Sequence, residues 1–183
     1  MPTEIERQYV VDTSHRDWQM LKSGLPAKKY VQATIHRGEW NKLRVRLIED
    51  LKTGEKSAAF TFKVDIKSKK DGPNIRDEYE WEVPYRVALY IMIGHTEVTK
   101  IRYSYRHTDG KIWEFDEYQW TNEGIVLADI EIKDEDEKFE IPSWIGQETT
   151  KLKKITNNSF SDHPFIHWSS EEKEWYKTLE KRK

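Results

Sequence analysis

Charged residues two positions apart recur along this chain. Glu4 and Glu6 flank an isoleucine near the start, and Arg44 and Arg46 flank a valine in the segment L-R-V-R. Successive side chains of a β-strand point to opposite faces of the sheet, so each pair would project from one face. The planar guanidinium of arginine suits bidentate contacts with phosphate. The spacing therefore raises the question whether these groups are only solvated or line an internal binding site.

Segments with period-2 alternation must position these side chains. Strands are predicted near residues 3–11, 30–36, 43–50, 57–65, 76–83, 96–106, 111–118 and 125–133. Helices are predicted at 15–22, between Pro84 and Gly94, and after Ser169 or Ser170, which would cap the last helix. Eight mainly antiparallel strands with few helices indicate a mainly β (α+β) protein, either a closed barrel or a sandwich.

The two faces of most predicted strands differ in charge. In the seventh strand, for example, Trp113 and Phe115 oppose Glu114 and Asp116. Carboxylates concentrate on the first, fifth, seventh and eighth strands, and bases on the third, fourth and sixth. Alternation alone fits a two-layer protein whose polar faces meet water. The segregation of acids from arginines favours a barrel with an ionised interior, which would need a highly charged ligand and cations to neutralise it.

Composition narrows the class of protein. A chain of 183 residues fits one domain with a real core. Its 31 Lys and Arg against 33 Asp and Glu give a net charge of -2, so a nucleic-acid partner is not expected. The lack of cysteine excludes disulfides and thiolate chemistry. No apolar run approaches the roughly 20 residues of a membrane helix, so we expect no membrane contact and a cytoplasmic location.

A series of short motifs gives the chain a family resemblance. They are E-I-E-R-Q from Glu4, L-R-V-R from Leu43, F-K from Phe62, R-D-E-Y-E from Arg76, K-I-R from Lys100, E-F-D-E-Y from Glu114, L-A-D-I-E from Leu127 and W-I-G-Q-E-T-T from Trp144. In this order they resemble the CYTH domain of the triphosphate tunnel metalloenzymes, over residue 4 to about residue 160. This family includes inorganic and thiamine triphosphatases and class IV adenylyl cyclases.

The resemblance implies a fold and a ligand. The fold would be an eight-stranded antiparallel closed β-barrel, a tunnel with a charged interior and a few flanking helices. The tunnel would bind a triphosphate together with Mg²⁺ or Mn²⁺, hard ions that prefer carboxylate oxygens and water. Residues 1–160 would form the tunnel domain, and residues 161–183 a C-terminal helical extension that packs on the barrel.

The resemblance also assigns roles to residues. The implied metal ligands are Glu4, Glu6, Asp129 and Glu131. The implied substrate-binding residues are Gln8, Arg44, Arg46, Lys63, Arg76, Lys100 and Arg102. The implied catalytic residues, which would support a second metal ion or orient water, are Glu78, Glu80 and Asp116. Less specific matches are Lys151, Lys153 and Lys154 for phosphate, and Glu148, to which no role is assigned.

Two positions depart from the family pattern. The first motif of the family usually ends in lysine, whereas this chain has Gln8. A neutral amide can hydrogen-bond to phosphate or water, but it supplies no charge and cannot act as a base. Asp129 replaces the usual glutamate and keeps the carboxylate with a shorter side chain. The change at Gln8 bears on the catalytic rate.

Three functions remain open. The first is a metal-dependent triphosphatase that removes the terminal phosphate of tripolyphosphate, ATP or thiamine triphosphate. The second is a class IV-like adenylyl cyclase, in which the ribose 3′-hydroxyl attacks the α-phosphorus. The third is a tunnel that binds triphosphates with little turnover, which Gln8 keeps open. The protein would be a monomer or a homodimer.

Other motifs favour structural interpretations. His163 and His167 have the spacing of two metal ligands, but Pro164 and the apolar residues between them favour packing or a turn. The eight glycines are scattered, so no phosphate-binding glycine-rich loop is present. The K-S-K-K segment at 67–70 is predicted to be a solvated loop. The tryptophans are expected to form outer packing rather than a platform for nucleobases.

Overall fold

The computed structural model describes residues 3–66 and 72–181, so the K-S-K-K segment lies outside the described residues. The strands are β1 (Thr3–Val11), β2 (Ala27–Arg37), β3 (Asn41–Asp50), β4 (Lys56–Ile66), β5 (Asn74–Glu82), β6 (Glu97–Arg106), β7 (Ile112–Tyr118), β8 (Val126–Glu131) and β9 (Ile145–Glu148). The helices are α1 (Arg16–Lys22), α2 (Tyr85–Met92), α3 (Asn157–Asp162) and α4 (Ser170–Glu180). Two 3₁₀ turns, η1 (Trp120–Asn122) and η2 (Phe165–His167), complete the described elements.

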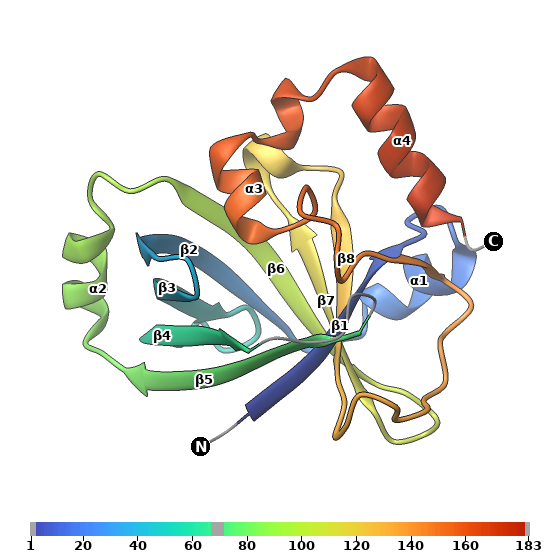
Figure 1. The fold of residues 1–183 in the computed structure, drawn as a ribbon, viewed down its shortest axis with the longest axis horizontal. Helices are drawn as coiled ribbons and strands as arrows, with labels where there is room; N and C mark the ends of the chain where they lie inside the picture. The colour runs from blue at the N-terminus through green and yellow to red at the C-terminus, as the bar shows by residue number, and fades with distance from the viewer. Residues whose placement is uncertain (1–2, 67–71, 182–183) are drawn as a thin grey trace.

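The first eight strands close into an antiparallel barrel (Figure 1). Their order is β5-β4-β3-β2-β6-β7-β8-β1, and β1 pairs back with β5. β1 can do this because its two halves have different partners. Residues Thr3 to Glu6 pair with β5, whereas Tyr9 and Val11 pair with the extra strand β9. The closed eight-stranded barrel confirms the predicted fold.

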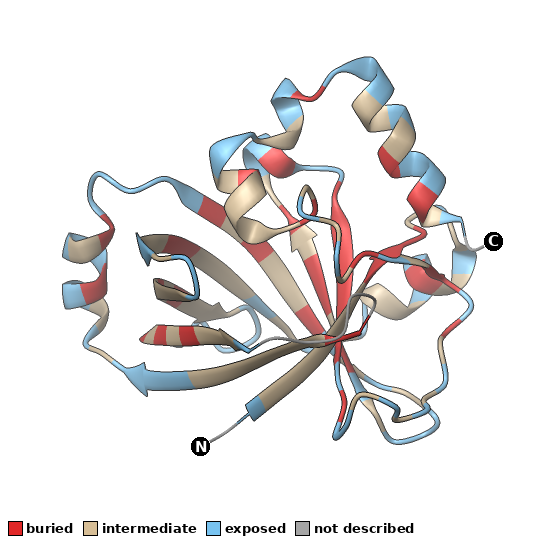
Figure 2. Ribbon diagram, viewed as in Figure 1, coloured by how far each residue is buried: buried red, intermediate tan, exposed pale blue. Residues whose placement is uncertain are grey.

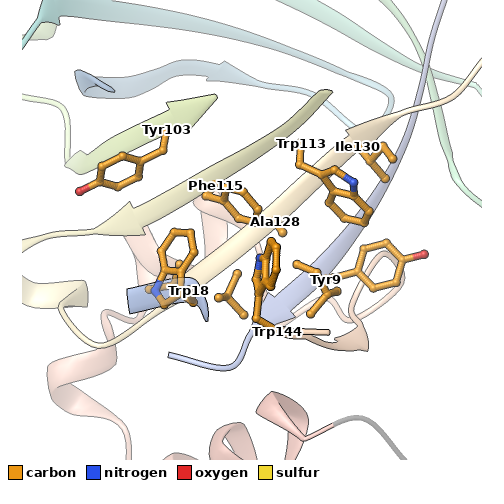
Figure 3. Packing of buried hydrophobic residues seen from close by; sticks show 11 residues of the cluster. Tyr9, Trp18, Tyr103, Trp113, Phe115, Ala128, Ile130 and Trp144 are labelled. Atoms are coloured by element: carbon orange, nitrogen blue, oxygen red, sulfur yellow. The ribbon is translucent and has the colours of Figure 1, made fainter. Parts of the chain in front are cut away.

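The apolar faces of the strands point outward and are covered from two sides. One outer core lies beneath α1 and the segment after β8, where Trp113 and Phe115 pack with Tyr9, Trp18 and Trp144 (Figure 3). A second lies beneath α2 and contains Ala33, Val45, Leu47, Ala58, Ala88 and Met92. The apolar faces therefore stabilise the barrel from outside, and the ionised faces are left to point inward.

A third apolar cluster lies inside the barrel at one end. Val10, Val98, Tyr118 and Leu127 project from the inner faces of β1, β6, β7 and β8. They pack against side chains that come from the C-terminal segment, namely Ile155, Phe160, Trp168, Tyr176 and Leu179. Figure 1 shows α3 and α4 on this side of the molecule, away from the N-terminus. We call this end of the barrel the plugged end.

Gly146 fixes the approach of α4 to the barrel. A Cβ atom at this position would lie 2.4 Å from the carbonyl oxygen of Leu179 and 2.8 Å from that of Glu180. Helix α4 begins with a capping box between Ser169 and Glu172. Ser169 is one of the two serines predicted to cap this helix. No helix among the described residues is both long and apolar enough to span a membrane.

The structure adds elements that the sequence pattern did not predict. The predicted strands and helices occur within a few residues of their expected bounds. β9 and α3 were missed because each is short, with four and six residues, and neither has enough length for a clear period.

Figure 2 shows that burial is densest along β8 and the second half of β1, whereas the end of β5 is exposed.

Candidate active site

The inner faces of the strands enclose a cavity of about 620 Å³. It is lined by nearly all the site residues that the family resemblance implied: Glu4, Glu6, Gln8, Arg44, Arg46, Lys63, Arg76, Glu78, Glu80, Lys100, Arg102, Asp129 and Glu131. Asp116 is the exception, since it is buried behind Lys100 and Arg102. The fold therefore brings together side chains that lie more than 120 residues apart in the sequence, such as Glu4 and Glu131.

Four carboxylates form a block across the β1–β8 pair. Glu6 lies directly opposite Glu131, and Gln8 directly opposite Asp129, with Glu4 two residues further along the same face of β1. Partial burial raises the pKa of Glu131, and the neighbouring Glu4 and Glu114 raise it further. Burial and the carboxylate of Glu6 raise the pKa of Asp129 well above its usual range. Like charges held this close are costly unless a cation lies between them.

Two bases separate parts of this acidic block. Lys63 contacts both Glu78 and Glu4, the latter at 3.2 Å between Nζ and Oε2. The guanidinium of Arg76 donates to Glu6 at 2.9 Å and lies 3.9 Å from Glu4. In the part of the chain that the structure describes, no three acidic or histidine side chains converge into a ready metal cluster. Glu4 and Glu6 meet protein cations instead.

Asp116 organises the bases of β6. It accepts two hydrogen bonds of 2.7 Å from Arg102 and one from the buried Lys100. Although burial opposes ionisation, the charges of Arg102 and Lys100 hold the pKa of Asp116 well below its usual range. Burial and the nearby Arg102 lower the pKa of Lys100 to about 8. Both oxygens of Asp116 are engaged, so it is placed to orient these bases.

Arg44 differs from the other bases of the cavity. Within the described residues, Arg44 forms no hydrogen bond or ion pair, and burial together with Arg46 lowers its pKa to about 10. The guanidinium of Arg46 lies 5.1 Å from the centre of the Tyr30 ring, and that of Arg102 lies 5.7 Å from it. Glu80 contacts Arg46 at 3.3 Å and accepts a hydrogen bond of 2.9 Å from Thr61. Arg44 is therefore a cation whose donors are free for an anionic ligand.

Gln8 is held between two polar partners. Its Nε2 donates to Asp129 at 3.1 Å, and its Oε1 accepts from the hydroxyl of Thr149 at 3.2 Å. The amide thus orients one carboxylate of the acidic block without adding charge.

Several weaker candidates lie outside the cavity. Glu148 pairs with Arg7 at 2.8 Å on the outer side of β1, and Lys154 pairs with Glu172 beside Trp168. Lys151 donates to the carbonyl of Pro73 at 3.1 Å. His163 accepts, through its carbonyl, a hydrogen bond from the indole of Trp168, which fits the structural interpretation of the H-P-F-I-H segment.

The cavity also contains residues that the sequence did not single out. They are Tyr30, Lys42, Asn74, Gly110, Lys111, Ile112, Glu114, Thr150, Thr156, Asn157 and Asn158. Alternation could have found Glu114, which shares a strand face with the predicted Asp116, whereas the strand of Tyr30 carries no predicted site residue. Nothing local could have found Asn157 and Asn158, because they reach the cavity only through the position of α3.

Comparisons with known proteins agree with this geometry. No family model matches the chain. The chain is 31% identical over 168 residues to an inorganic triphosphatase of Acetivibrio thermocellus, covering 90% of this chain and 97% of that protein. It is 29% identical over 97 residues to an inorganic triphosphatase of Nitrosomonas europaea, covering 51% and 64% of the two chains.

Solved structures share the fold. A crystal structure of an inorganic triphosphatase superposes with a TM-score of 0.55 at 25% identity, covering 88% of this chain and 95% of that chain. A Hippeastrum protein, described as a putative adenylyl cyclase with a dominant triphosphatase activity, has a TM-score of 0.50 at 15% identity, covering 72% and 80%. With the relative from Acetivibrio thermocellus, these findings show that the chain belongs to the triphosphate tunnel, or CYTH, family that contains the inorganic triphosphatases.

Proposed function

We propose that this protein is a metal-dependent hydrolase of inorganic triphosphate. One observation supports it above the others: a single cavity holds a block of carboxylates on β1 and β8 and a set of arginine and lysine side chains on β3 to β6. A triphosphate carries about four negative charges, which the bases can match while cations neutralise the acids. Phosphoryl transfer needs mainly positioning and charge stabilisation, which such a cavity supplies.

The donor set fits a hard divalent cation. Glu4, Glu6, Asp129 and Glu131 offer only carboxylate oxygens, the ligands that Mg²⁺ and Mn²⁺ prefer. Glu131 has no cationic partner among the described residues, and the acids around it raise its pKa. We assign these four residues to the metal ion. When bound there, Mg²⁺ or Mn²⁺ would screen the phosphate charge and acidify a bound water molecule.

The remaining residues have roles that follow from their contacts. Arg44, Arg46, Lys63, Arg76, Lys100 and Arg102 would bind phosphate oxygens. Lys63 and Arg76 would then exchange their carboxylate partners for the substrate, and Asp116 would keep Arg102 and Lys100 in position. Glu78 and Glu80 would orient the attacking water. Its oxygen would bond to the terminal phosphorus while the bridging P–O bond breaks, releasing phosphate and pyrophosphate and one proton to solvent.

The lining favours a bare triphosphate over a nucleotide. Tyr30 is the one aromatic side chain among the described residues that line the cavity, and two guanidiniums already stack against its ring. A nucleobase would therefore lack the aromatic platform on which bases usually stack. This disfavours the cyclase alternative, which requires a positioned ribose and base.

The test compares substrates and products directly. The protein is incubated with tripolyphosphate, ATP and thiamine triphosphate in Mg²⁺ or Mn²⁺, and phosphate, pyrophosphate and cyclic AMP are measured. We expect phosphate and pyrophosphate from tripolyphosphate, with much slower turnover of the organic substrates. Cyclic AMP from ATP would favour the cyclase, and tight binding without any product would favour a binding tunnel.

Gln8 allows a separate test of rate. Gln8→Lys restores the charge that the family usually has at this position, next to Asp129. If the amide limits catalysis, this variant should raise kcat for tripolyphosphate. A lower kcat would indicate instead that the neutral contact with Asp129 is adapted to this site.

A further inference from the structure

The plugged end of the cavity is bordered by two asparagines of the C-terminal segment. Asn157 and Asn158 line the cavity, although they lie beyond the strands that carry the acids and bases. Their side-chain oxygens are engaged by the barrel wall: the hydroxyl of Tyr118 donates to Oδ1 of Asn157 at 2.9 Å, and that of Thr34 donates to Oδ1 of Asn158 at 3.1 Å. The wall thus fixes the orientation of both amides.

Both side-chain NH₂ groups are left as free donors. An asparagine amide has one acceptor oxygen and one nitrogen with two N–H bonds. In residues 3–66 and 72–181, neither Nδ2 atom has a hydrogen-bond partner, whereas both Oδ1 atoms do. N–H donors of residues that line a cavity, and that have no acceptor within the protein, are suited to bind an anion.

Each amide is placed beside a base of the cavity. Thr34, which holds Asn158, lies directly opposite Arg44 in the β2–β3 pair. Tyr118, which holds Asn157, lies directly opposite Lys100 in the β6–β7 pair. Arg44 has no acid partner among the described residues, so the plugged end offers cationic and neutral donors together. The acids Glu114 and Glu131, in contrast, lie near the hairpin that joins β6 to β7, at the other end.

We propose that Asn157 and Asn158 form, with Arg44, a subsite for the terminal phosphate that does not react. This inference rests on the proposed hydrolysis of triphosphate and gives the substrate a direction in the tunnel. One free terminal phosphate occupies the plugged end, and the phosphoryl group that is cleaved lies toward the carboxylates. The pyrophosphate product is then the part that the subsite retains, so pyrophosphate should bind there as a competitive inhibitor.

Asparagine-to-aspartate variants isolate the donors. Asn157→Asp and Asn158→Asp keep the oxygen that accepts from Tyr118 or Thr34, but replace NH₂ by a second, negatively charged oxygen. Each should raise the KM for tripolyphosphate about 10- to 100-fold, with kcat changed less than about threefold. The inhibition constant of pyrophosphate should rise in parallel. Asn157→Ala and Asn158→Ala, which add no charge, should raise KM about 3- to 10-fold.

A matched control adds the same charge elsewhere. Asn41→Asp also keeps an acceptor, here for His36 at 3.1 Å, but lies in the β2–β3 hairpin outside the lining of the cavity. It should leave KM and kcat unchanged. Circular dichroism and thermal melting check that every variant is folded, and the alanine variants provide the test if an aspartate variant does not fold.

The outcomes separate this inference from the proposed function. If the wild-type protein hydrolyses tripolyphosphate and the four variants retain its KM, the subsite is wrong and the function stands. A fall in kcat at constant KM would also overturn it. If the wild type has no turnover, calorimetry can still test the subsite by measuring the binding of tripolyphosphate in the presence of a metal chelator. Weaker binding by the aspartate variants than by Asn41→Asp would support the subsite, and equal binding would refute it.

Discussion

The two ends of the cavity satisfy their charges in opposite ways. At the end opposite the plug, several acids and bases neutralise one another, as in the contacts of Lys63 with Glu4 and of Arg76 with Glu6. At the plugged end, Arg44 has no acid partner among the described residues, and the amides of Asn157 and Asn158 keep free donors. A ligand must therefore compete with existing ion pairs at one end, but meets unpaired donors at the other. The difference gives the cavity a direction along its axis.

The largest expected effect concerns the acidic end. Glu6→Gln removes one charge from the block formed with Glu131 and Asp129, and it leaves the shape almost unchanged. The rate of tripolyphosphate hydrolysis should fall roughly 100-fold or more. Mutation of residues that only support the ligands of a metal ion already lowers metal affinity or activity about 10- to 100-fold. A chelator should abolish the activity of the wild type, and added Mn²⁺ or Mg²⁺ should restore it. An unchanged rate in Glu6→Gln would contradict the assignment of the metal site.

The second prediction compares an arginine from each end. Arg44→Met should raise the KM for tripolyphosphate about 10- to 100-fold, since it removes a charge-assisted phosphate contact. It should not lower the free energy of unfolding, because it removes a cation without breaking an ion pair. Arg76→Met should lower the free energy of unfolding by about 2 kcal/mol or more, because Glu6 and Glu4 lose their partner. Chemical denaturation and steady-state kinetics measure both effects, and equal destabilisation by the two changes would remove the contrast between the ends.

A third prediction tests how the plug is held. Gly146→Ala would place a methyl group 2.4 Å from the carbonyl oxygen of Leu179, so α4 must shift. We expect a loss of about 1–3 kcal/mol of unfolding free energy, typical of overpacking. Gly24→Ala is the matched control, because its nearest neighbour would be 3.8 Å away. If the thermal melting curves of the two variants coincide, the close approach at Gly146 does not constrain α4.

The smallest effect is expected at Tyr30. Its ring lies against the guanidiniums of Arg46 and Arg102, so it should position these arginines without contacting the reacting phosphate. Tyr30→Leu should raise KM about 2- to 20-fold, the range expected from lost cation–π contacts, with little change in kcat. Tyr30→Phe retains the ring and should behave like the wild type. If both variants were equally impaired, the hydroxyl rather than the ring would be responsible.

The family resemblance assigned roles to the charged residues, and strand alternation, which is local, predicted which of them share a face. The period of two places Glu4 and Glu6 on one face whatever the partner strand is, and the same holds for Arg44 and Arg46. Asp116 was among the residues assigned from the sequence. Its buried position behind Lys100 and Arg102 was not predicted, because the depth of a residue depends on the neighbouring strands. Gln8 was recognised as a departure, whereas its contacts with Asp129 and Thr149 depend on pairing between distant strands.

The sequence by itself determined which side chains of each strand share a face, since charged and apolar residues alternate along the strand. It also determined the balance of acids and bases within the barrel. Only the tertiary structure decided which acid meets which base, because strand register and barrel closure join residues far apart in the sequence, such as Glu6 with Asn74 and Glu6 with Glu131. It also decided that one end is plugged, because α3 and α4 reach the inner face through packing with Val10, Tyr118 and Leu127 rather than through any local pattern.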